Sequence, residues 1–206
     1  TSNRYRRNVC AKAAASASLG LLLTFLCSTP GQCLTYTVFD VAGADSSDAY
    51  AINAKGVVAG PYTSNGSNIP HGYIRDALGN ITTFDVKGAT SGTSPNGIND
   101  HGAVVGTYDD AGGSHGFLRR PSGKIVSIDV AGSSNTVATA INKPGSIAGY
   151  YSDGAGTHGF VRDSFGIVAS FDMPGATSTT PYGISQNGSI TGYFVDAKGT
   201  HGFVRD

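Results

Sequence analysis

The stretch IDVAGSSNTVATAINKPGSIAGYYSDGAGTHGFVRDSFGIVASFD, residues 128–172, decides the fold because its pattern recurs along the chain. It opens on an Ile-Asp pair, passes an Ile-Asn turn, a glycine and a His-Gly-Phe segment, and ends on the Phe-Asp pair that opens the next copy. Four copies follow one another at a period of about 44 residues, which is typical of proteins built from one repeated supersecondary unit. The shared anchors are Phe39-Asp40, Phe84-Asp85, Ile128-Asp129 and Phe171-Asp172, then Ile52-Asn53, Ile98-Asn99, Ile141-Asn142 and Ile184-Ser185, then Gly60, Gly106, Gly149 and Gly192, and last His71-Gly72-Tyr73, His115-Gly116-Phe117, His158-Gly159-Phe160 and His201-Gly202-Phe203.

Each copy contains four short candidate strands, with turn residues between them. In the quoted copy they are 124–130, 137–142, 146–151 and 158–163. Asn stands first and Gly last in one set of turns, which favours type I hairpin tips at 53–56, 99–102 and 142–145. A second set suits three-residue hairpin loops with a left-handed glycine, at 77–79, 121–123 and 164–166. No stretch after residue 34 carries a helical period, so the sequence predicts an all-β fold.

The longer links rich in Gly, Ala and Thr, such as 86–95 and 173–181, are predicted to be the crossovers between repeats. A blade then runs from the Ile-Asn strand outward through the Gly-rich strand and the His-Gly-Phe strand to the Phe-Asp strand. Because such small four-stranded sheets must bury their faces against neighbours, the expected architecture is a β-propeller. The repeats are predicted at about 34–78, 79–122, 123–165 and 166–206.

The phase of the repeat leaves one strand unassigned at each end. Residues 34–41 would form an outermost strand without a blade, and the last copy ends before supplying such a strand. The first strand could supply the outermost strand that the last blade lacks. This pairing would close a four-bladed ring and would set His201 opposite Asp40. The alternative is a fragment of a longer array.

The units Phe171-Asp172-Met173-Pro174-Gly175, Gly183-Ile184-Ser185-Gln186-Asn187-Gly188 and His201-Gly202-Phe203 resemble the bacterial extracellular repeat family named HAF after its His-Ala-Phe segment. The resemblance covers nearly everything after residue 34. This chain departs from it by having Gly in place of Ala, and Ser185 in place of the usual Asn. The resemblance implies a secreted protein with a propeller-like fold. The family carries no settled activity, so it implies no catalytic residue.

The N-terminus is typical of a secretory signal, predicted over residues 1–33 and removed by cleavage, with the repeat domain over 34–206. A basic stretch to Lys12 precedes an apolar run from Ala13 to Leu26, and residues 28–32 provide a plausible cleavage region. An uncleaved membrane anchor is the alternative, although the run is short for a membrane span. The sequence therefore predicts a secreted or periplasmic protein with no membrane association after cleavage.

Composition excludes several classes of partner and cofactor. All 14 acidic residues are Asp, and removal of the four basic residues near the N-terminus leaves a mildly acidic mature chain. Such a charge disfavours nucleic acid as a partner. The three cysteines lie at or before residue 33, so the folded domain is expected to have neither an internal disulfide nor a cysteine metal site. No cofactor is predicted.

Recurring His and Asp residues are the first candidate site. In a hairpin with a centred three-residue loop, each His faces an Asp, which gives the pairs His71 and Asp85, His115 and Asp129, and His158 and Asp172, with His201 and Asp40 across the chain ends. A carboxylate beside an imidazole can orient a general base. The pair recurs in each repeat without a nucleophile, however, which favours a structural role that ties two strands together. No catalytic residue is assigned.

The residues that end the innermost strands form a second candidate site, an axial ring of Asn53, Asn99, Asn142 and Ser185. Innermost strands alone approach the axis of a propeller, so this ring could bind water, an ion or a polar ligand, or else cap its own turns. The four repeat histidines are held too far apart to share a metal ion, and no metal site is predicted. Aromatic residues two positions after the shared glycine are expected to form a ladder between blades: Tyr62, Tyr108, Tyr151 and Phe194.

These features favour a noncatalytic protein that binds a ligand or serves as a structural module outside the cell. Its expected partner is an extracellular glycan or protein, contacted through the crossover loops. The alternative function is a propeller hydrolase or lyase acting on an extracellular polymer or glycoside. Such an enzyme should break the repeat symmetry at one cleft.

Overall fold

The computed structural model describes residues 24–25 and 34–206, with side chains from residue 36 onward. The predicted signal segment lies outside the described residues apart from Thr24–Phe25. The chain divides into two compact units, one ending at Ala42 and the other spanning Gly43–Asp206. The described residues form strands and turns without a helix, as the sequence predicts, and they contain no helical segment that could cross a membrane.

In the unit that ends at Ala42, strand β1 (Thr24–Phe25) pairs antiparallel with β2 (Leu34–Thr35). The predicted outer strand over 34–41 is wrong beyond its first two residues, because 36–41 have no strand structure. Leu34 and Thr35 take Phe25 and Thr24 as their ladder partners.

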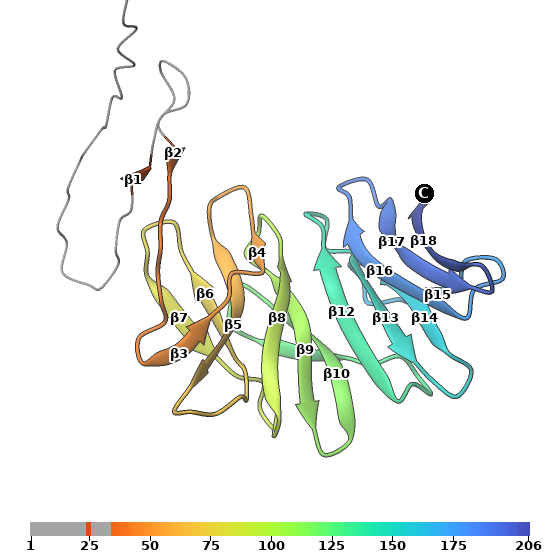
Figure 1. Cartoon of the computed structure of the whole chain (residues 1–206), viewed down its shortest axis with the longest axis horizontal. Coiled ribbons are helices and arrows are strands. Elements are labelled where there is room, and N and C mark those ends of the chain that lie inside the picture. Colours follow the sequence, from red (N-terminus) through yellow and green to blue (C-terminus); the bar gives the residue numbers. More distant parts are fainter. Residues whose placement is uncertain (1–23, 26–33) are drawn as a thin grey trace, which may run out of the picture. The chain divides into compact units, whose positions relative to one another are not determined.

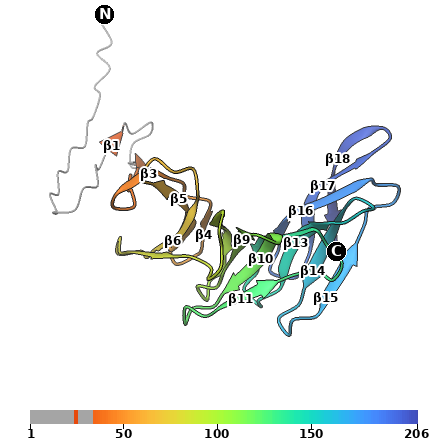
Figure 2. The ribbon, with the colours of Figure 1, turned by 90° about the horizontal axis from the view of Figure 1, so that it is seen from below.

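The second unit has a five-stranded sheet and an eleven-stranded sheet, and the larger one divides into three groups of consecutive strands; we call these four strand groups blades 1 to 4 (Figures 1 and 2). Blade 1 contains β3 (Ala44–Ser47), β4 (Ala51–Ile52), β5 (Val58–Ser64), β6 (His71–Arg75) and β7 (Ile81–Phe84). Blade 2 contains β8 (Gly92–Ile98), β9 (Val104–Asp110), β10 (Gly113–Arg119) and β11 (Ile125–Ile128). Blade 3 contains β12 (Asn135–Ile141), β13 (Ile147–Ser152), β14 (Thr157–Arg162) and β15 (Val168–Phe171), and blade 4 contains β16 (Ser178–Ile184), β17 (Ile190–Asp196) and β18 (Gly199–Arg205).

Blades 2 and 3 pair antiparallel in chain order from the Ile-Asn strand to the Phe-Asp or Ile-Asp strand, and blade 1 follows the same order with its first strand divided into β3 and β4. Blade 4 has the first three of these strands. The predicted phase of the blade is therefore confirmed. The crossovers are shorter than predicted, since β8 and β16 already begin at Gly92 and Ser178. One parallel bridge links blade 2 to blade 3, Ser114 with Asn135, and another links blade 3 to blade 4, Thr157 with Ser178.

The predicted turns are also confirmed. In the inner hairpins the amide of the last Gly donates to the carbonyl of the first residue, at 2.9 to 3.1 Å, and each Gly has a positive φ. The outer loop glycines Gly79, Gly123 and Gly166 have positive φ as well, at 97°, 87° and 103°. Turn chemistry at the repeated Asn and Gly positions thus fixes where each strand ends.

The core lies between blades rather than within them. Ala59 of blade 1 packs in one cluster with Ile98, Val104 and Phe117 of blade 2. Equivalent clusters join blade 2 to blade 3 and blade 3 to blade 4, around Phe160 and Phe203. Since a four-stranded sheet has two faces to bury, each blade depends on its neighbours for stability.

The predicted closure of a four-bladed ring is not confirmed. Among the described residues, β18 pairs only with β17, and no closed sheet is present. Asp40 belongs to the unit that ends at Ala42, so its pairing with His201 stays a prediction.

Candidate functional site

Each predicted local His and Asp pair lies within hydrogen-bond distance in the structure. The third strand of a blade supplies the His, and the Asp comes directly after the fourth strand. Nδ1 of His71 lies 3.0 Å from Asp85, Nδ1 of His115 lies 2.6 Å from Asp129, and Nδ1 of His158 lies 2.9 Å from Asp172. Each pair therefore ties the third strand of its blade to the end of the fourth.

A second carboxylate, which sequence reasoning missed, reaches three of the histidines from the end of the second strand. Nε2 of His115 lies 3.1 Å from Oδ1 of Asp110, Nε2 of His158 lies 3.2 Å from Oδ1 of Asp153, and Nε2 of His201 lies 3.2 Å from Oδ1 of Asp196. The separation in sequence is five residues in each case, a signal that the repeat alignment already contained.

The paired carboxylates favour the charged form of two imidazoles. The hydrogen bond to Asp129 raises the pKa of His115, and that to Asp172 raises the pKa of His158, against a smaller opposing effect of burial. Backbone N–H donors, from Gly112 first, lower the pKa of Asp110. In its charged form, an imidazole between two carboxylates donates a hydrogen bond from each ring nitrogen.

The aromatic residues after the shared glycine stack on these imidazoles. The ring centroids of Tyr108 and His115 lie 5.1 Å apart, and those of Tyr151 and His158 lie 5.2 Å apart. Tyr62 and Phe194 contact His71 and His201 in the same way. The same rings also lie in the clusters between blades: Tyr108 belongs to the cluster that joins blades 1 and 2, and Tyr151 and Phe194 pack against the next two clusters. The predicted aromatic contacts between blades are therefore present beside the contacts with His within each blade.

Three members of the predicted axial ring connect the blades in series. The Asn53 amide donates to the carbonyl of Asn99 at 2.9 Å, the Asn99 amide to Asn142 at 3.0 Å, and the Asn142 amide to Ser185 at 3.0 Å. The side-chain oxygen of each Asn accepts two backbone N–H groups from its own turn, as in Asn99 with His101 and Ala103. Each Asn carboxamide thus caps its turn and bridges to the next blade.

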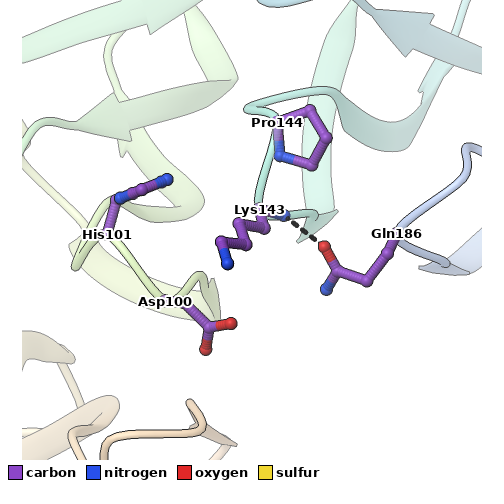
Figure 3. Close-up of a pocket in the computed structure, with 5 residues that line it drawn as sticks. All are labelled: Asp100, His101, Lys143, Pro144 and Gln186. Atoms are coloured by element: carbon purple, nitrogen blue, oxygen red, sulfur yellow. Dashed lines mark hydrogen bonds between the residues drawn. The ribbon is translucent and has the colours of Figure 1, made fainter.

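Ser185 lacks the amide needed to continue this series, and its hydroxyl instead donates to Asn187 at 2.6 Å. Beside the Asn series, the turn tips border a cavity of about 610 Å³ lined by Asp100, His101, Lys143, Pro144 and Gln186 (Figure 3). Its polar groups are partly engaged by the protein. Asp100 accepts the Ala54 amide at 2.9 Å and Gln186 accepts the Lys143 amide at 3.0 Å.

A second cavity, of about 630 Å³, lies on the inner strands, and we call it the tyrosine cavity. A β-bulge in the innermost strand of blades 2, 3 and 4 positions part of its lining. The pairing register skips one residue between Pro95 and Gly97, between Ala138 and Ala140, and between Pro181 and Gly183. The skipped residues Asn96, Thr139 and Tyr182 line the cavity, and Tyr50 holds the corresponding place before β4 in blade 1. The full lining is Ala49, Tyr50, Asn96, Thr107, Val137, Thr139, Tyr150 and Tyr182.

The shared glycine stands opposite this bulge for a steric reason. An added Cβ at Gly149 would overlap with the carbonyl oxygen of Val137, and one at Gly106 would overlap with that of Ser94. Only glycine permits this close approach of the two inner strands. The invariant glycine and the exchangeable bulge residue are therefore two parts of one local structure.

Tyrosine side chains in the cavity project from the core rather than filling it. Tyr50 and Tyr182 are 59% and 60% exposed. The ring of Tyr182 contacts that of Tyr193, with centroids 5.6 Å apart. Burial raises the pKa of Tyr150 and of Tyr182, and the neighbouring Tyr193 raises the pKa of Tyr182 further. These hydroxyls therefore stay neutral and can donate hydrogen bonds at ordinary pH.

Sequence reasoning missed the tyrosine cavity although its signal was present. The position three residues before the Asn anchor holds Tyr50, Asn96, Thr139 and Tyr182 in turn, while the residue before it is Ala or Pro and the residue after it is Ala or Gly in every repeat. Among the residues with described side chains, no group of three or more His, Cys, Asp or Glu residues could hold a metal ion.

Comparisons with known proteins bear on the fold alone. No protein-family model and no curated protein sequence matches the chain. The structure is similar to that of TolB from Acinetobacter baumannii, with a TM-score of 0.61 and 15% identity over 84% of this chain and 43% of that one. This chain therefore spans less than half the length of TolB. Two further structures give lower scores. Streptogramin B lyase has a TM-score of 0.48 and 14% identity, over 85% of this chain and 59% of that one. Virginiamycin B lyase from Staphylococcus aureus has a TM-score of 0.46 and 13% identity, over 88% of this chain and 62% of that one. The blades and the likeness to TolB together show an all-β fold of the β-propeller type.

Proposed function

We propose that this chain is a noncatalytic, exported propeller module that binds an extracellular ligand in the tyrosine cavity. One observation carries the proposal: the repeats differ from one another at the bulge positions that line this cavity. Positions that hold the strands of a blade together, or join one blade to the next, keep nearly the same residue in every copy, namely the His, the Asp, the shared glycine and the Asn anchor. The bulge position instead holds three different kinds of side chain, namely tyrosine at Tyr50 and Tyr182, then Asn96 and Thr139, and both tyrosines are exposed.

The proposed ligand site lies on the inner strands rather than on the crossover loops that the sequence favoured. Buried threonines form hydrogen bonds with the crossovers. The Thr93 hydroxyl accepts a bond from the Val86 backbone N–H, and the Thr179 hydroxyl accepts one from the Met173 backbone N–H, both at 3.1 Å. Thr93 and Thr179 are fully buried. Because these links are short and internally bonded, they offer few free groups to a partner.

The alternative function, a hydrolase or lyase, needs a free acid or base at one asymmetric cleft. The His and Asp groups recur in every blade, and both ring nitrogens of His115 and His158 face carboxylates. The tyrosine cavity breaks the symmetry, but its lining contains no His, Asp or Glu. Release of reducing ends or unsaturated products from an array polymer would favour the enzyme over the binding module.

The binding role is tested with the exported chain on arrays of extracellular glycans, polymers and peptides. Capture of a ligand should be lost in Tyr182→Ala and kept in Phe165→Ala, since Phe165 is also an exposed aromatic residue, 91% exposed, but lies on an outer hairpin. Equal capture by both variants would contradict a site at the tyrosine cavity.

Export and membership of the HAF family are parts of the same proposal. The N-terminal segment supports cleavage, with a mature chain that begins between about Gly31 and Leu34. N-terminal sequencing of protein recovered outside the cytoplasm tests this step. An uncleaved chain recovered with the membrane would replace the secreted form with an anchored one.

A further inference from the structure

The two cavities of the blade unit differ in charge. The cavity at the turn tips includes Asp100 and Lys143, whereas the lining of the tyrosine cavity contains no Asp, Lys, Arg or His. A charged ligand in the tyrosine cavity would lose hydration without gaining an opposite charge, which is costly. The lining therefore selects for an uncharged ligand.

The aromatic rings supply flat apolar surfaces within this polar setting. Tyr50 and Tyr182 come from blades 1 and 4, and Tyr150 comes from the second strand of blade 3. The contact with Tyr193 restricts the Tyr182 ring, so little side-chain freedom is lost when a ligand packs on it. Aliphatic C–H groups on one face of a sugar ring suit the electron-rich face of such a phenol.

The polar residues of the cavity present hydrogen-bond acceptors. The Asn96 amide donates to the Ala138 carbonyl at 3.0 Å, which turns its side-chain oxygen away from that bond, and the described side chains give this oxygen no partner. The Thr139 hydroxyl donates to the Ala148 carbonyl at 3.0 Å and keeps its lone pairs. Acceptors of this kind suit a ligand rich in hydroxyl donors.

On these grounds we infer that the tyrosine cavity binds a neutral saccharide, whose ring packs on Tyr50 or Tyr182 and whose hydroxyls donate to Asn96 and Thr139. This inference rests on the proposed binding function and specifies its ligand class. The volume of about 630 Å³ lies within the range of about 300–1,000 Å³ that is usual for small-molecule sites and leaves room for more than one sugar unit.

The test compares matched neutral and acidic sugars by calorimetry on the exported chain. Cellobiose, maltose, α-1,4-galactobiose and N,N′-diacetylchitobiose are the neutral probes, and digalacturonic acid is the charged counterpart of galactobiose. Because the chain has ten tyrosines and no tryptophan, tyrosine fluorescence gives a second signal for stacking on the rings. We expect at least one neutral probe to bind with a Kd of about 1 mM or lower, and digalacturonic acid to bind at least roughly tenfold more weakly than galactobiose.

Variants at Tyr182 separate the ring from its hydroxyl. Tyr182→Ala should weaken saccharide binding roughly tenfold, the order expected for loss of one well-packed aromatic contact, while Tyr182→Phe keeps most of it. Phe165→Ala should bind as the unchanged chain does. Since Tyr182 is 60% exposed, its truncation should leave the urea unfolding midpoint nearly unchanged, and this measurement shows that the variant is folded.

The outcomes distinguish a failure of the saccharide inference from a failure of the proposed binding function. Binding of digalacturonic acid as tightly as galactobiose, or no binding of any neutral probe, overturns the saccharide inference. If an array ligand of another class is then lost in Tyr182→Ala, the binding module stands and only its ligand class was wrong. If no ligand depends on Tyr182, both the inference and the proposed site fail.

Discussion

The glycine of the His-Gly-Phe segment provides the sharpest test of how the blades are packed. In blade 3 the ring of Phe171 lies directly over Gly159. A Cβ added to Gly159 would lie 2.8 Å from Cζ of Phe171 and 3.0 Å from both Cε atoms. Gly202 is the equivalent residue in blade 4, and there the Gly192 carbonyl oxygen, at 4.0 Å, is the one neighbour within 4 Å. Alanine should therefore be costly at Gly159 and acceptable at Gly202.

The magnitude follows from two opposing effects. Carbon atoms pack at about 3.5 to 4.0 Å, so the Phe171 ring must move, and overpacking of this kind costs about 1 to 3 kcal/mol. The ring is not free to move, because Phe171 packs edge-on against Phe203 and beneath Arg205, 4.6 Å from its guanidinium carbon. Neither glycine has a positive φ, so alanine also restricts the unfolded chain, which stabilises by about 0.4 to 1 kcal/mol. We expect Gly159→Ala to destabilise by about 1 to 2 kcal/mol and Gly202→Ala to be neutral or slightly stabilising.

Urea unfolding followed by far-UV circular dichroism measures both variants. An unchanged slope of the transition is required before midpoints are compared, since arrays of blades need not unfold in one step. Thermal midpoints should differ by roughly 2 to 8 °C between the variants for a domain of this size. If Gly159→Ala is tolerated, the steric reasoning is wrong. If Gly202→Ala costs as much as Gly159→Ala, another strand covers the last blade, as closure of the ring through Phe39-Asp40 would require.

Further variants address the polar contacts and their pH dependence. Asn99→Ala should cost about 2 to 4 kcal/mol because two turn amides and one bridge between blades lose their partner. Asn99→Ser also removes the bridge but should cost less, because a serine hydroxyl can accept a turn amide; equal costs in urea unfolding would show that serine does not cap this turn. His158→Ala should lower the free energy of unfolding by about 1 to 3 kcal/mol, because two hydrogen bonds are lost. Ligand binding should fall only in proportion to the unfolded fraction. If binding is abolished while the unfolding midpoint is unchanged, His158 belongs to the ligand site. Folding raises the pKa values of His115 and His158, so the folded chain binds more protons near neutrality than the unfolded chain does. The stability that the two charged histidines add is therefore present below about pH 6.5 and is lost as the pH rises through their pKa values in the folded chain. A urea midpoint that rises between about pH 6 and 8 would contradict this sign.

The local structure of each blade could be predicted from the sequence because it depends on short-range chemistry. Asn and Gly at fixed positions determine the turns, and these turns determine the register of each hairpin. The register then sets His158 beside Asp172, 14 residues away, so this contact follows from strand pairing alone. The phase of the blade could be predicted for the same reason, since a strand ends where its turn begins.

Contacts between blades were decided by the tertiary structure. The amide of Asn99 meets the carbonyl of Asn142, 43 residues away, and the sequence pattern that predicted the turn cap gave no indication of this second bond. It depends on how two separate sheets pack, which residue spacing does not encode. Ser185 receives the last of these bonds through its carbonyl, and its own hydroxyl donates to Asn187 within the same turn.

The tyrosine cavity illustrates the same limit most clearly. Alternation along a strand assigns each residue to one face, but a bulge shifts this alternation by one residue and re-aims the side chain at that point. Tyr182 therefore projects into a cavity with Tyr50 and Tyr150, residues from blades far apart in the chain. The sequence by itself determined the repeat, the strands and the turns, because these follow from interactions between near neighbours. The tertiary structure decided which variable side chains share a cavity, because that depends on the bulge and on the packing of one blade against the next.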